Sequence, residues 1–286
     1  MNNKILKQNL KNNLKNNENY FNSEHFNFDW LAGLIDGDGC FLINKLGYAS
    51  LEINVAAVDL KMLQYIQSYF KGSVKFRANY ACVRYRLHKK SDLIRLIQCV
   101  NGRLRNSIRQ QQFKRLCDHY GLDCKFAKNF TWDSAYVSGL MDSDGKVVLS
   151  VKKHYSPQNL IGTYGKIMRL THACQMQLTL GITQKYESNV KFLKQPMNSK
   201  NEKPFGIISF DKSQNGYYTW YISNRYEINQ LLIYFKTYPC RSVKNHRLNL
   251  IKVYYDLIDN KAHKSSCVLL QTQWHNFARL WFKYSI

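Results

Sequence analysis

Polar and apolar residues alternate along several short stretches of the chain. The alternation is clearest in Tyr48–Ala57, where the polar side chains are Ser50, Glu52 and Asn54 and the apolar ones are Leu51, Ile53 and Val55. Successive side chains of a strand point to opposite faces, so this pattern predicts a strand with one packed face and one solvated face. Further strands are predicted at Cys40–Leu46, Val74–Arg77 and Cys82–His88.

In other stretches the apolar residues recur every three or four positions, which predicts helices. One helix is expected from Asn27 to Asp36. A second is expected to begin with Asp59 as its N-cap and to end at Gly72. Two more are expected, one starting at Ser91 and one spanning Ile108–Tyr120. The resulting order, αββαββα, describes an α+β unit with a four-stranded antiparallel sheet.

The same order of elements returns from Trp132 onward. The predicted strands are Val147–Lys152, Arg169–Ile182, Ile207–Phe210 and Tyr217–Ile222. An insertion, His154–Lys166, separates the first two strands, and a last helix opens in segment 238–244 and runs to about Ile258. The sequence therefore predicts an α+β fold built from two pseudo-symmetric αββαββα repeats, each with its own four-stranded antiparallel sheet.

These elements divide the chain into five segments. The first repeat is expected at residues 27–121, the linker at 122–131 and the second repeat at 132–258. Residues 1–26 alternate Asn with Lys and are expected to form a disordered basic extension. Residues 259–286 carry Trp274, Phe277 and Trp281 at helical spacing, so we expect a C-terminal helical tail that docks on the second repeat.

Two copies of one short motif occupy equivalent places in the repeats. They are Trp30–Gly39, with the sequence WLAGLIDGDG, and Tyr136–Gly145, with the sequence YVSGLMDSDG. In the first copy the apolar side chains lie on one side of a helix, while Ala32 and Gly33 leave another side nearly bare. A bare helix face allows another backbone to approach closely. We therefore expect the two motif helices to pack against each other through their glycines.

Each motif ends with two aspartates, at a point where the orphan carbonyls of a helix make the potential negative. If the helices pair, Asp38 and Asp144 come together among oxygen atoms that suit Mg²⁺ or Ca²⁺. One motif alone fits equally well a buried helix whose aspartates cap a turn. Two copies 106 residues apart, in a chain with only 19 acidic residues, favour the metal site. Asp36 and Asp142 point elsewhere on the helix. We expect them to form hydrogen bonds that brace the ends of the contact between the two motif helices, which we call the seam.

The charge of the chain indicates its class of partner. The formal net charge is +23, which favours a polyanion such as nucleic acid. A ribosomal or membrane-surface protein is the alternative. Hydrophobic residues make up 45% of the chain, and the 20 Tyr, 15 Phe and 5 Trp require cores to fill, which excludes a simple basic tail.

The compartment is predicted from weaker patterns. No apolar run is long enough for a membrane span, so we expect no membrane partner. The eight cysteines lack metal-binding spacing and are expected to be reduced. Frequent Asn, Lys, Ile, Tyr and Phe are typical of an AT-rich genome, which favours a gene carried by an organelle, the mitochondrion before the chloroplast.

The first motif, LAGLIDGDG at Leu31–Gly39, closely resembles the motif of the LAGLIDADG homing endonucleases. The second copy departs from it at several positions but keeps its glycine, both aspartates and the final glycine. Segment 238–244, with Tyr238, Ser242 and Lys244, also resembles a late element of the family. The resemblance implies a two-repeat monomer that uses a divalent metal to make a double-strand break at a long DNA site.

The resemblance also implies roles for particular residues. Asp38 and Asp144 would each help to hold Mg²⁺, assisted by the backbone carbonyls of Gly37 and Ser143. Basic residues would neutralise the charge of the transition state, and the candidates are Lys244 with either Arg105 or Arg109.

The two sheets would lie side by side as a saddle over double-stranded DNA, with alternate side chains reaching base edges. The candidate DNA-binding residues are Ser50, Glu52, Asn54, Arg84 and Arg86 in the first repeat and Lys152, Gln175, Gln177 and Thr179 in the second. Each of them fits equally well a solvated strand residue. Two other functions remain open: a maturase that binds its host intron RNA, and a non-catalytic DNA-binding regulator, which would be expected to lose an aspartate.

Overall fold

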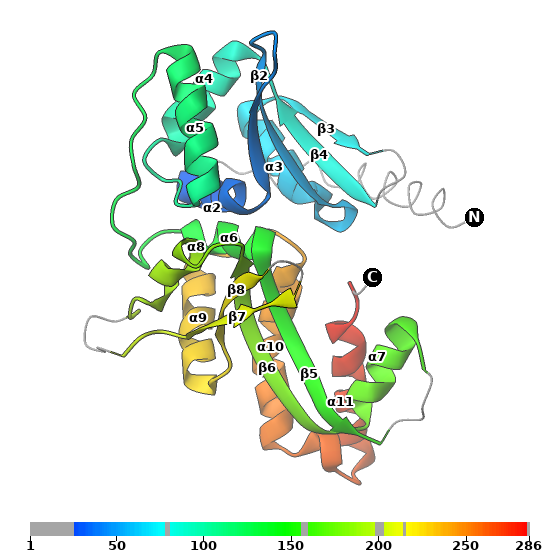
Figure 1. The fold of residues 1–286 in the computed structure, drawn as a ribbon. Coiled ribbons are helices and arrows are strands. Elements are labelled where there is room, and N and C mark those ends of the chain that lie inside the picture. Colours follow the sequence, from blue (N-terminus) through cyan, green and yellow to red (C-terminus); the bar gives the residue numbers. More distant parts are fainter. Residues whose placement is uncertain (1–25, 78–80, 156–159, 198–202, 214–215, 285–286) are drawn as a thin grey trace.

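The computed structural model describes residues 26–77, 81–155, 160–197, 203–213 and 216–284. Helices α2 (Phe28–Asp38) and α6 (Tyr136–Asp144) pack against each other between the two halves of the molecule (Figure 1). The extension predicted for residues 1–26 lies outside the described residues, except for Phe26. Phe26 is buried and stacks on Tyr65 and Tyr69, so the described chain begins inside the core.

The first repeat follows α2 with one sheet and three further helices. Its strands are β1 (Gly39–Ile43), β2 (Ala49–Ala56), β3 (Ser73–Phe76) and β4 (Cys82–Leu87). Its helices are α3 (Leu60–Phe70), α4 (Lys90–Val100) and α5 (Ser107–Tyr120). The strands form an antiparallel sheet in the order β1-β2-β4-β3.

The second repeat has the same sheet topology. Its strands are β5 (Gly145–His154), β6 (Ala173–Gln184), β7 (Ile207–Asp211) and β8 (Tyr217–Ile222), in the order β5-β6-β8-β7. Its helices are α7 (Gly162–Thr171), α8 (Ser188–Lys191), α9 (Arg225–Thr237) and α10 (Lys244–Asp259). The predicted α+β fold with two similar four-stranded antiparallel sheets is therefore confirmed.

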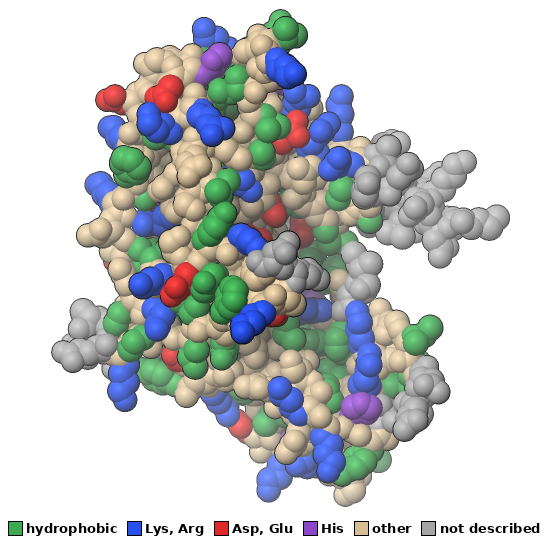
Figure 2. Space-filling view, in the orientation of Figure 1, with side chains coloured by type: hydrophobic (Ala, Val, Ile, Leu, Met, Phe, Trp, Pro, Cys, Tyr) green, Lys and Arg blue, Asp and Glu red, His purple; other side chains and the backbone are tan. Residues whose placement is uncertain are grey.

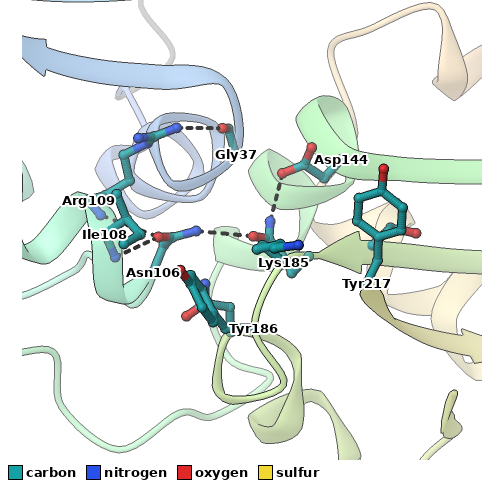
Figure 3. Close-up of a pocket in the computed structure, with 11 residues that line it drawn as sticks. Gly37, Asn106, Ile108, Arg109, Asp144, Lys185, Tyr186 and Tyr217 are labelled. Atoms are coloured by element: carbon teal, nitrogen blue, oxygen red, sulfur yellow. Dashed lines mark hydrogen bonds between the residues drawn. The ribbon is translucent and has the colours of Figure 1, made fainter. Parts of the chain in front are cut away.

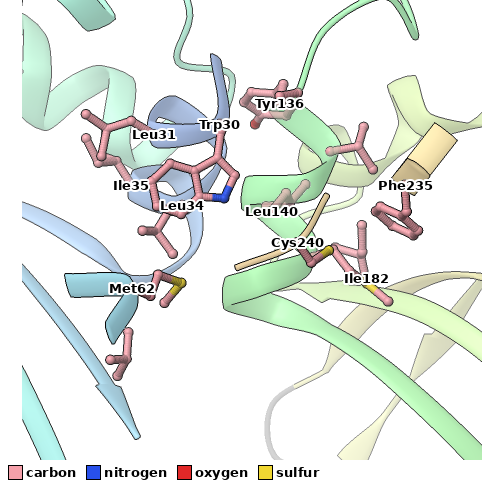
Figure 4. Packing of buried hydrophobic residues seen from close by; sticks show 14 of the residues in the cluster. Trp30, Leu31, Leu34, Ile35, Met62, Tyr136, Leu140, Ile182, Phe235 and Cys240 are labelled. Atoms are coloured by element: carbon pink, nitrogen blue, oxygen red, sulfur yellow. The ribbon is translucent and has the colours of Figure 1, made fainter. Parts of the chain in front are cut away.

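The contact between α2 and α6 depends on two glycines. A Cβ atom at Gly33 would lie 2.0 Å from the carbonyl oxygen of Tyr136, and one at Gly139 would lie 1.9 Å from that of Trp30. No side chain fits at such distances, so the two backbones touch. This contact through the glycines is the one predicted from the bare helix faces. The apolar residues beside the glycines, including Leu34 and Leu140, are buried in the core at this seam (Figure 4).

Several predicted boundaries were wrong, and two of them concern the site and the insertion. Helix α2 continues to Asp38, two residues beyond the predicted end at Asp36. The predicted strand at Arg169–Ile182 begins too early, because residues up to Thr171 belong to α7 and β6 starts at Ala173. Helix α7 lies within the insertion and beyond it, where alternation along the chain gave no sign of a helix.

A last helix, α11 (Val268–Trp281), packs against α7 and α10. Trp274, Phe277 and Trp281 are buried there, and the Trp274 indole donates to the backbone carbonyl of Leu170 on α7 at 3.3 Å. The inserted helix and the terminal helix therefore cover each other's apolar sides. Among the described residues, no helix combines the length and the apolar composition needed to cross a bilayer.

Candidate active site

Helices α2 and α6 end at the same place, with Asp38 and Asp144 as their last residues. A Cβ atom at Gly37 would lie 2.0 Å from the hydroxyl oxygen of Ser143 and 2.7 Å from carboxylate oxygen Oδ2 of Asp144. The ends of the two helices are therefore in contact. The glycine in the first motif leaves room for the larger serine of the second.

The electrostatics of this place favour a cation. Burial, followed by the negative charge of Asp144, raises the pKa of Asp38 to about 7. Burial also raises the pKa of Asp144, although Lys244 and a hydrogen bond from Gln184 oppose the effect. Two neighbouring half-buried carboxylates repel each other when both are charged, and a bound cation relieves that repulsion.

The donors at this place fit a hard divalent ion. Within the described ranges, no group of three or more His, Cys, Asp or Glu residues could hold a metal by itself. A metal here would therefore depend on the two carboxylates, supplemented by water or by oxygen atoms of a bound partner. Mg²⁺ keeps several waters and commonly uses one or two protein carboxylates together with phosphate oxygens. Asp38 and Asp144 match that donor set.

The basic residues around the aspartates are Lys244 and Arg109. The Lys244 ammonium donates to the backbone carbonyls of Met141, Asp142 and Ser143 at 3.1, 2.9 and 2.6 Å. Arg109 donates from Nη2 to the carbonyl of Gly37 at 3.4 Å. The carbonyls of Gly37 and Ser143, predicted as metal ligands, thus already accept hydrogen bonds from the two basic side chains.

The prediction of Arg105 as a basic residue at the aspartates does not agree with the structure. Its guanidinium lies over the rings of Phe130, Tyr136 and Phe192, with centroid distances of 5.4, 5.3 and 5.7 Å. It also donates to the carbonyl of Lys128 at 2.8 Å. The aromatic cluster draws the side chain away from the seam end. Of the two arginines considered, Arg109 is the one beside the carboxylates.

Asp36 and Asp142 brace the seam, as predicted, and they do so in equivalent ways. Asp36 accepts a hydrogen bond of 2.6 Å from the Tyr136 hydroxyl of the other repeat, and Asp142 accepts one of 2.8 Å from the Trp30 indole. Each also accepts two backbone N–H groups from its own repeat. Those donors are Arg105 and Asn106 for Asp36, and Arg241 and Ser242 for Asp142.

Sequence reasoning missed Gln184 and Asn106. Gln184 donates to Oδ2 of Asp144 at 2.6 Å, and its own carbonyl accepts from the Asn106 amide at 3.1 Å (Figure 3). Both residues line a cavity of about 400 Å³ that reaches Asp144, Gly37 and Arg109. Gln184 is the last residue of β6, two positions beyond the predicted end of that strand. The polar residues on the predicted strand gave no reason to extend it.

The predicted polar face of the first sheet is present, with one exception. Glu52 pairs directly with Arg86, and Asn54 with Arg84, across β2 and β4. Directly paired residues share a face, so all four lie on the same side of the sheet. Ser50 is buried, with 4% of its surface exposed, so it does not belong to the solvated part of that face.

In the second sheet, the predicted residues Gln175 and Gln177 are exposed and Thr179 is half-buried. Lys152, which was also predicted, is exposed and lies at a register shift in β5. Val151 pairs with Met176 and Lys153 pairs with Gln175, which leaves Lys152 without a partner on β6. Lys152 lines a cavity together with Gln175 and Gln177 of β6 and with Tyr254 and Ile258 of α10, and Lys153 is the residue directly paired with Gln175. Strict alternation along the sequence cannot reveal such a bulge.

Comparisons with known proteins agree with this geometry. The family model described as LAGLIDADG endonuclease matches residues 31–120 and 137–255. The chain is 39% identical over 253 residues to the intron-encoded RNA maturase bI4 of Saccharomyces cerevisiae, covering 88% of this chain and 36% of that protein. It is 34% identical over 281 residues to the probable intron-encoded endonuclease aI2 of Debaryomyces hansenii, covering 98% of this chain and 40% of that protein.

The chain thus spans about two fifths of the length of these two relatives. It spans 82% of the intron-encoded DNA endonuclease ai2a of Dictyostelium discoideum, at 28% identity over 97% of this chain. Among solved structures, the fold is similar to LAGLIDADG meganuclease I-AabMI bound to uncleaved DNA, with a TM-score of 0.61 and 19% identity over 89% of this chain and 98% of that one.

A second solved structure, meganuclease I-SmaMI bound to uncleaveable DNA, has a TM-score of 0.64 at 17% identity, covering 90% of this chain and 98% of that one. The family model covers both repeats, and each of its two matches contains one of the paired motif helices. The chain belongs to the LAGLIDADG endonuclease family.

Proposed function

We propose that the chain is a site-specific DNA endonuclease that makes a metal-dependent double-strand break at a long target site, as in intron homing. The observation that carries the proposal is the meeting of Asp38 and Asp144 at the end of a pseudo-symmetric seam, with basic side chains beside them. A protein that only bound nucleic acid would gain nothing from two half-buried carboxylates at this place, because they repel phosphate.

Each aspartate serves one DNA strand in this proposal. The pseudo-twofold relation between the repeats matches the relation between the two strands of a duplex, so one chain acts as a monomer on both. Asp38 and Asp144 would hold Mg²⁺, which supplies activation of water and stabilisation of the charge on the leaving oxygen. Lys244 and Arg109 lie beside the carboxylates and add positive charge where the phosphate becomes more negative.

The polar faces of the two sheets would contact the DNA on either side of the cut. Two-stranded ribbons fit the major groove, where side chains can distinguish base pairs. The residues assigned to this contact are Glu52, Asn54, Arg84 and Arg86 in the first repeat and Lys153, Gln175, Gln177 and Thr179 in the second. Figure 2 shows Lys and Arg side chains spread over both halves of the visible face, which favours phosphate contacts.

A second function, assistance to splicing of a host intron RNA, is favoured by one comparison. The Saccharomyces relative that is 39% identical over 88% of this chain is named an RNA maturase. Several relatives are named as intron-encoded, which also supports a gene carried by an organellar genome, and we place it in the mitochondrion. RNA binding and DNA cleavage can coexist in one chain, since RNA contacts do not require the carboxylates.

Cleavage of a supercoiled plasmid tests the proposed function. The plasmid carries the intronless allele of the host gene and is incubated with the purified chain and Mg²⁺. We expect one double-strand break, abolished by chelation and by Asp38→Asn or Asp144→Asn. Asp118→Asn is the matched control, because Asp118 is an exposed acid that pairs with Lys114 on α5. Full activity of either seam variant would exclude these carboxylates from the reaction.

Binding separates the two candidate functions. With Ca²⁺ in place of Mg²⁺, the Asp38→Asn variant is expected to retain binding to the DNA target. If the chain never cleaves the allele but accelerates splicing of the intron RNA equally with and without Asp38, the result excludes the endonuclease and supports the maturase function.

A further inference from the structure

Glu52 lies between two arginines on the polar face of the first sheet. Its Oε1 atom is 3.2 Å from Nε of Arg86, and its Oε2 atom is 3.3 Å from Nη1 of Arg84. The Glu52 side chain is 14% exposed, whereas those of Arg84 and Arg86 are 36% and 48% exposed. The carboxylate therefore lies under the two guanidinium groups, and the arginines form the outer layer of this cluster.

The two ion pairs use different edges of the arginines. Arg86 is ion-paired with Glu52 through Nε, the nitrogen nearest its own backbone, so this contact does not use its two terminal nitrogens. Two parallel N–H groups on the terminal edge match the O6 and N7 acceptors of guanine in the major groove. Arg84 donates to Glu52 from a terminal nitrogen, so part of the equivalent edge is already used.

The carboxylate weakens the affinity of this face for nucleic acid in general. Glu52 offsets one of the two positive charges and repels phosphate, so a surface selected only for affinity would lack it. Glu52 instead restricts the arginine side chain. An arginine that is already held by a carboxylate loses less rotamer freedom when it hydrogen-bonds a base at two points. Glu52 does not itself present a free acceptor to a base, because each of its oxygens already faces an arginine.

We infer that Arg86 reads a guanine in the half-site contacted by the first repeat and that Glu52 is the positioning residue that holds it for this contact. The inference rests on the proposed DNA-binding function and names one base of its target. Arg84, on the same strand and bound to the same carboxylate, contacts backbone phosphate.

The test is selection of binding sites from a randomised duplex library by the full chain in Ca²⁺, which measures recognition separately from cleavage. The wild-type chain is expected to require guanine at one position of the first half-site. Arg86→Ala should reduce discrimination at that position by on the order of 10-fold or more and leave the other positions unchanged. Arg84→Ala is the matched control, and it should lower affinity for all sequences without removing the guanine.

Glu52→Gln provides the second arm. It should keep or raise affinity for random duplex while reducing discrimination at the guanine position several-fold, with an unchanged melting temperature. A guanine preference that survives Arg86→Ala, or that Arg84→Ala removes instead, overturns the inference. A change confined to a cytosine position in Glu52→Gln also overturns it, because Glu52 would then read a base directly. If the wild-type chain selects no sequence, both the inference and the proposed function fail, whereas a selected site insensitive to Arg86 overturns the inference alone.

Discussion

The carboxylate of Asp59 accepts the backbone N–H of Val243 at 2.7 Å, across the boundary between the repeats. Asp59 directly precedes α3, where the sequence predicted an N-cap, but it makes no capping hydrogen bond within that helix. Asn189 of the second repeat makes the equivalent contact in the other direction, accepting from the backbone N–H of Ser107 at 3.1 Å. Each repeat thus fixes the first turn of the other repeat's last long helix.

Loss of the Asp59 contact is expected to affect Lys244, the residue after Val243. Asp59→Ala leaves the Val243 N–H without its partner, which should destabilise the fold by about 1–2 kcal/mol. It should also lower the cleavage rate more than binding, because Lys244 is no longer held beside the aspartates. Denaturant unfolding and single-turnover cleavage measure the two effects. Asp59→Asn keeps an acceptor and is the control; an equal loss in both variants would show that the negative charge matters and the contact does not.

Replacing Gly33 tests the seam. Gly33→Ala places a Cβ atom 2.0 Å from the Tyr136 carbonyl oxygen, so the two helices must separate. We expect the free energy of unfolding to fall by about 3 kcal/mol or more, at the upper end of the range for overpacked cores. Gln273→Ala, at an exposed position of α11, should change it by less than about 0.5 kcal/mol. A stable and active Gly33→Ala chain would contradict the close backbone contact.

The raised pKa of Asp38 predicts how stability depends on pH. Its folded pKa of about 7 exceeds its ordinary value of 3.8, so the folded state binds the proton more tightly than the unfolded state does. This stabilisation is complete below pH 3.8 and is lost as pH rises to about 7. Without divalent metal, the wild-type chain should lose on the order of 2 kcal/mol more than Asp38→Asn between pH 5 and pH 7.

Urea unfolding of both proteins at the two pH values, in chelator, measures that difference. Burial also raises the pKa of Asp36 to about 6, so the comparison with Asp38→Asn is needed to isolate one carboxyl group. Added Mg²⁺ should restore much of the loss in the wild-type chain and little in the variant. Parallel pH curves for the two proteins would contradict the assignment of the raised pKa to Asp38.

The hydrogen bond from Gln184 distinguishes the two halves of the site. In the aligned sheets, the position equivalent to Gln184 in the first repeat is occupied by Val55, which cannot donate a hydrogen bond. Gln184→Leu should therefore slow cleavage of the strand served by Asp144 by about 10-fold or more and leave the other strand nearly unchanged. Nicked circular plasmid would accumulate before linear product. An equal slowing of both strands would contradict a role confined to Asp144.

Arg105 and Arg109 form a natural pair for comparison. Arg109 lies beside the carboxylates, so Arg109→Ala should reduce the cleavage rate strongly with little loss of stability. Arg105 packs on three aromatic rings, so Arg105→Ala should lower the free energy of unfolding by about 1–2 kcal/mol and preserve cleavage at permissive temperature. The reverse pattern would restore the original prediction for Arg105.

The sequence predicted the repeat architecture because each motif combines strong local signals. The glycines at 33 and 139 required a close partner, and the aspartates two positions apart at each helix end required a compensating charge. These features are local, and their duplication ruled out coincidence. Lys244 could be found from the sequence because its segment resembles a family element that opens the last repeat helix, and it lies beside the end of α6.

The residues that were misplaced depend on tertiary contacts. The side chain of Arg105 follows an aromatic cluster assembled from the linker and the second repeat, which no local pattern reveals. The bulge in β5 at Lys152 breaks the period of two, so alternation along the sequence did not reveal that Lys153 is the residue paired with Gln175. Asp59 stands where a helix N-cap is expected, but its carboxylate accepts a hydrogen bond from the backbone N–H of Val243 in the other repeat.

The β5–β6 hairpin is longer than the β1–β2 hairpin, so the two would cover DNA segments of different length. Strands β5 and β6 have 10 and 12 residues, whereas β1 and β2 have 5 and 8. Four extra residues at about 3.3 Å each extend the longer ribbon by roughly 13 Å, close to the rise of four base pairs. A duplex lying along both ribbons would be covered further on one flank, so the break would fall off-centre in the protected segment.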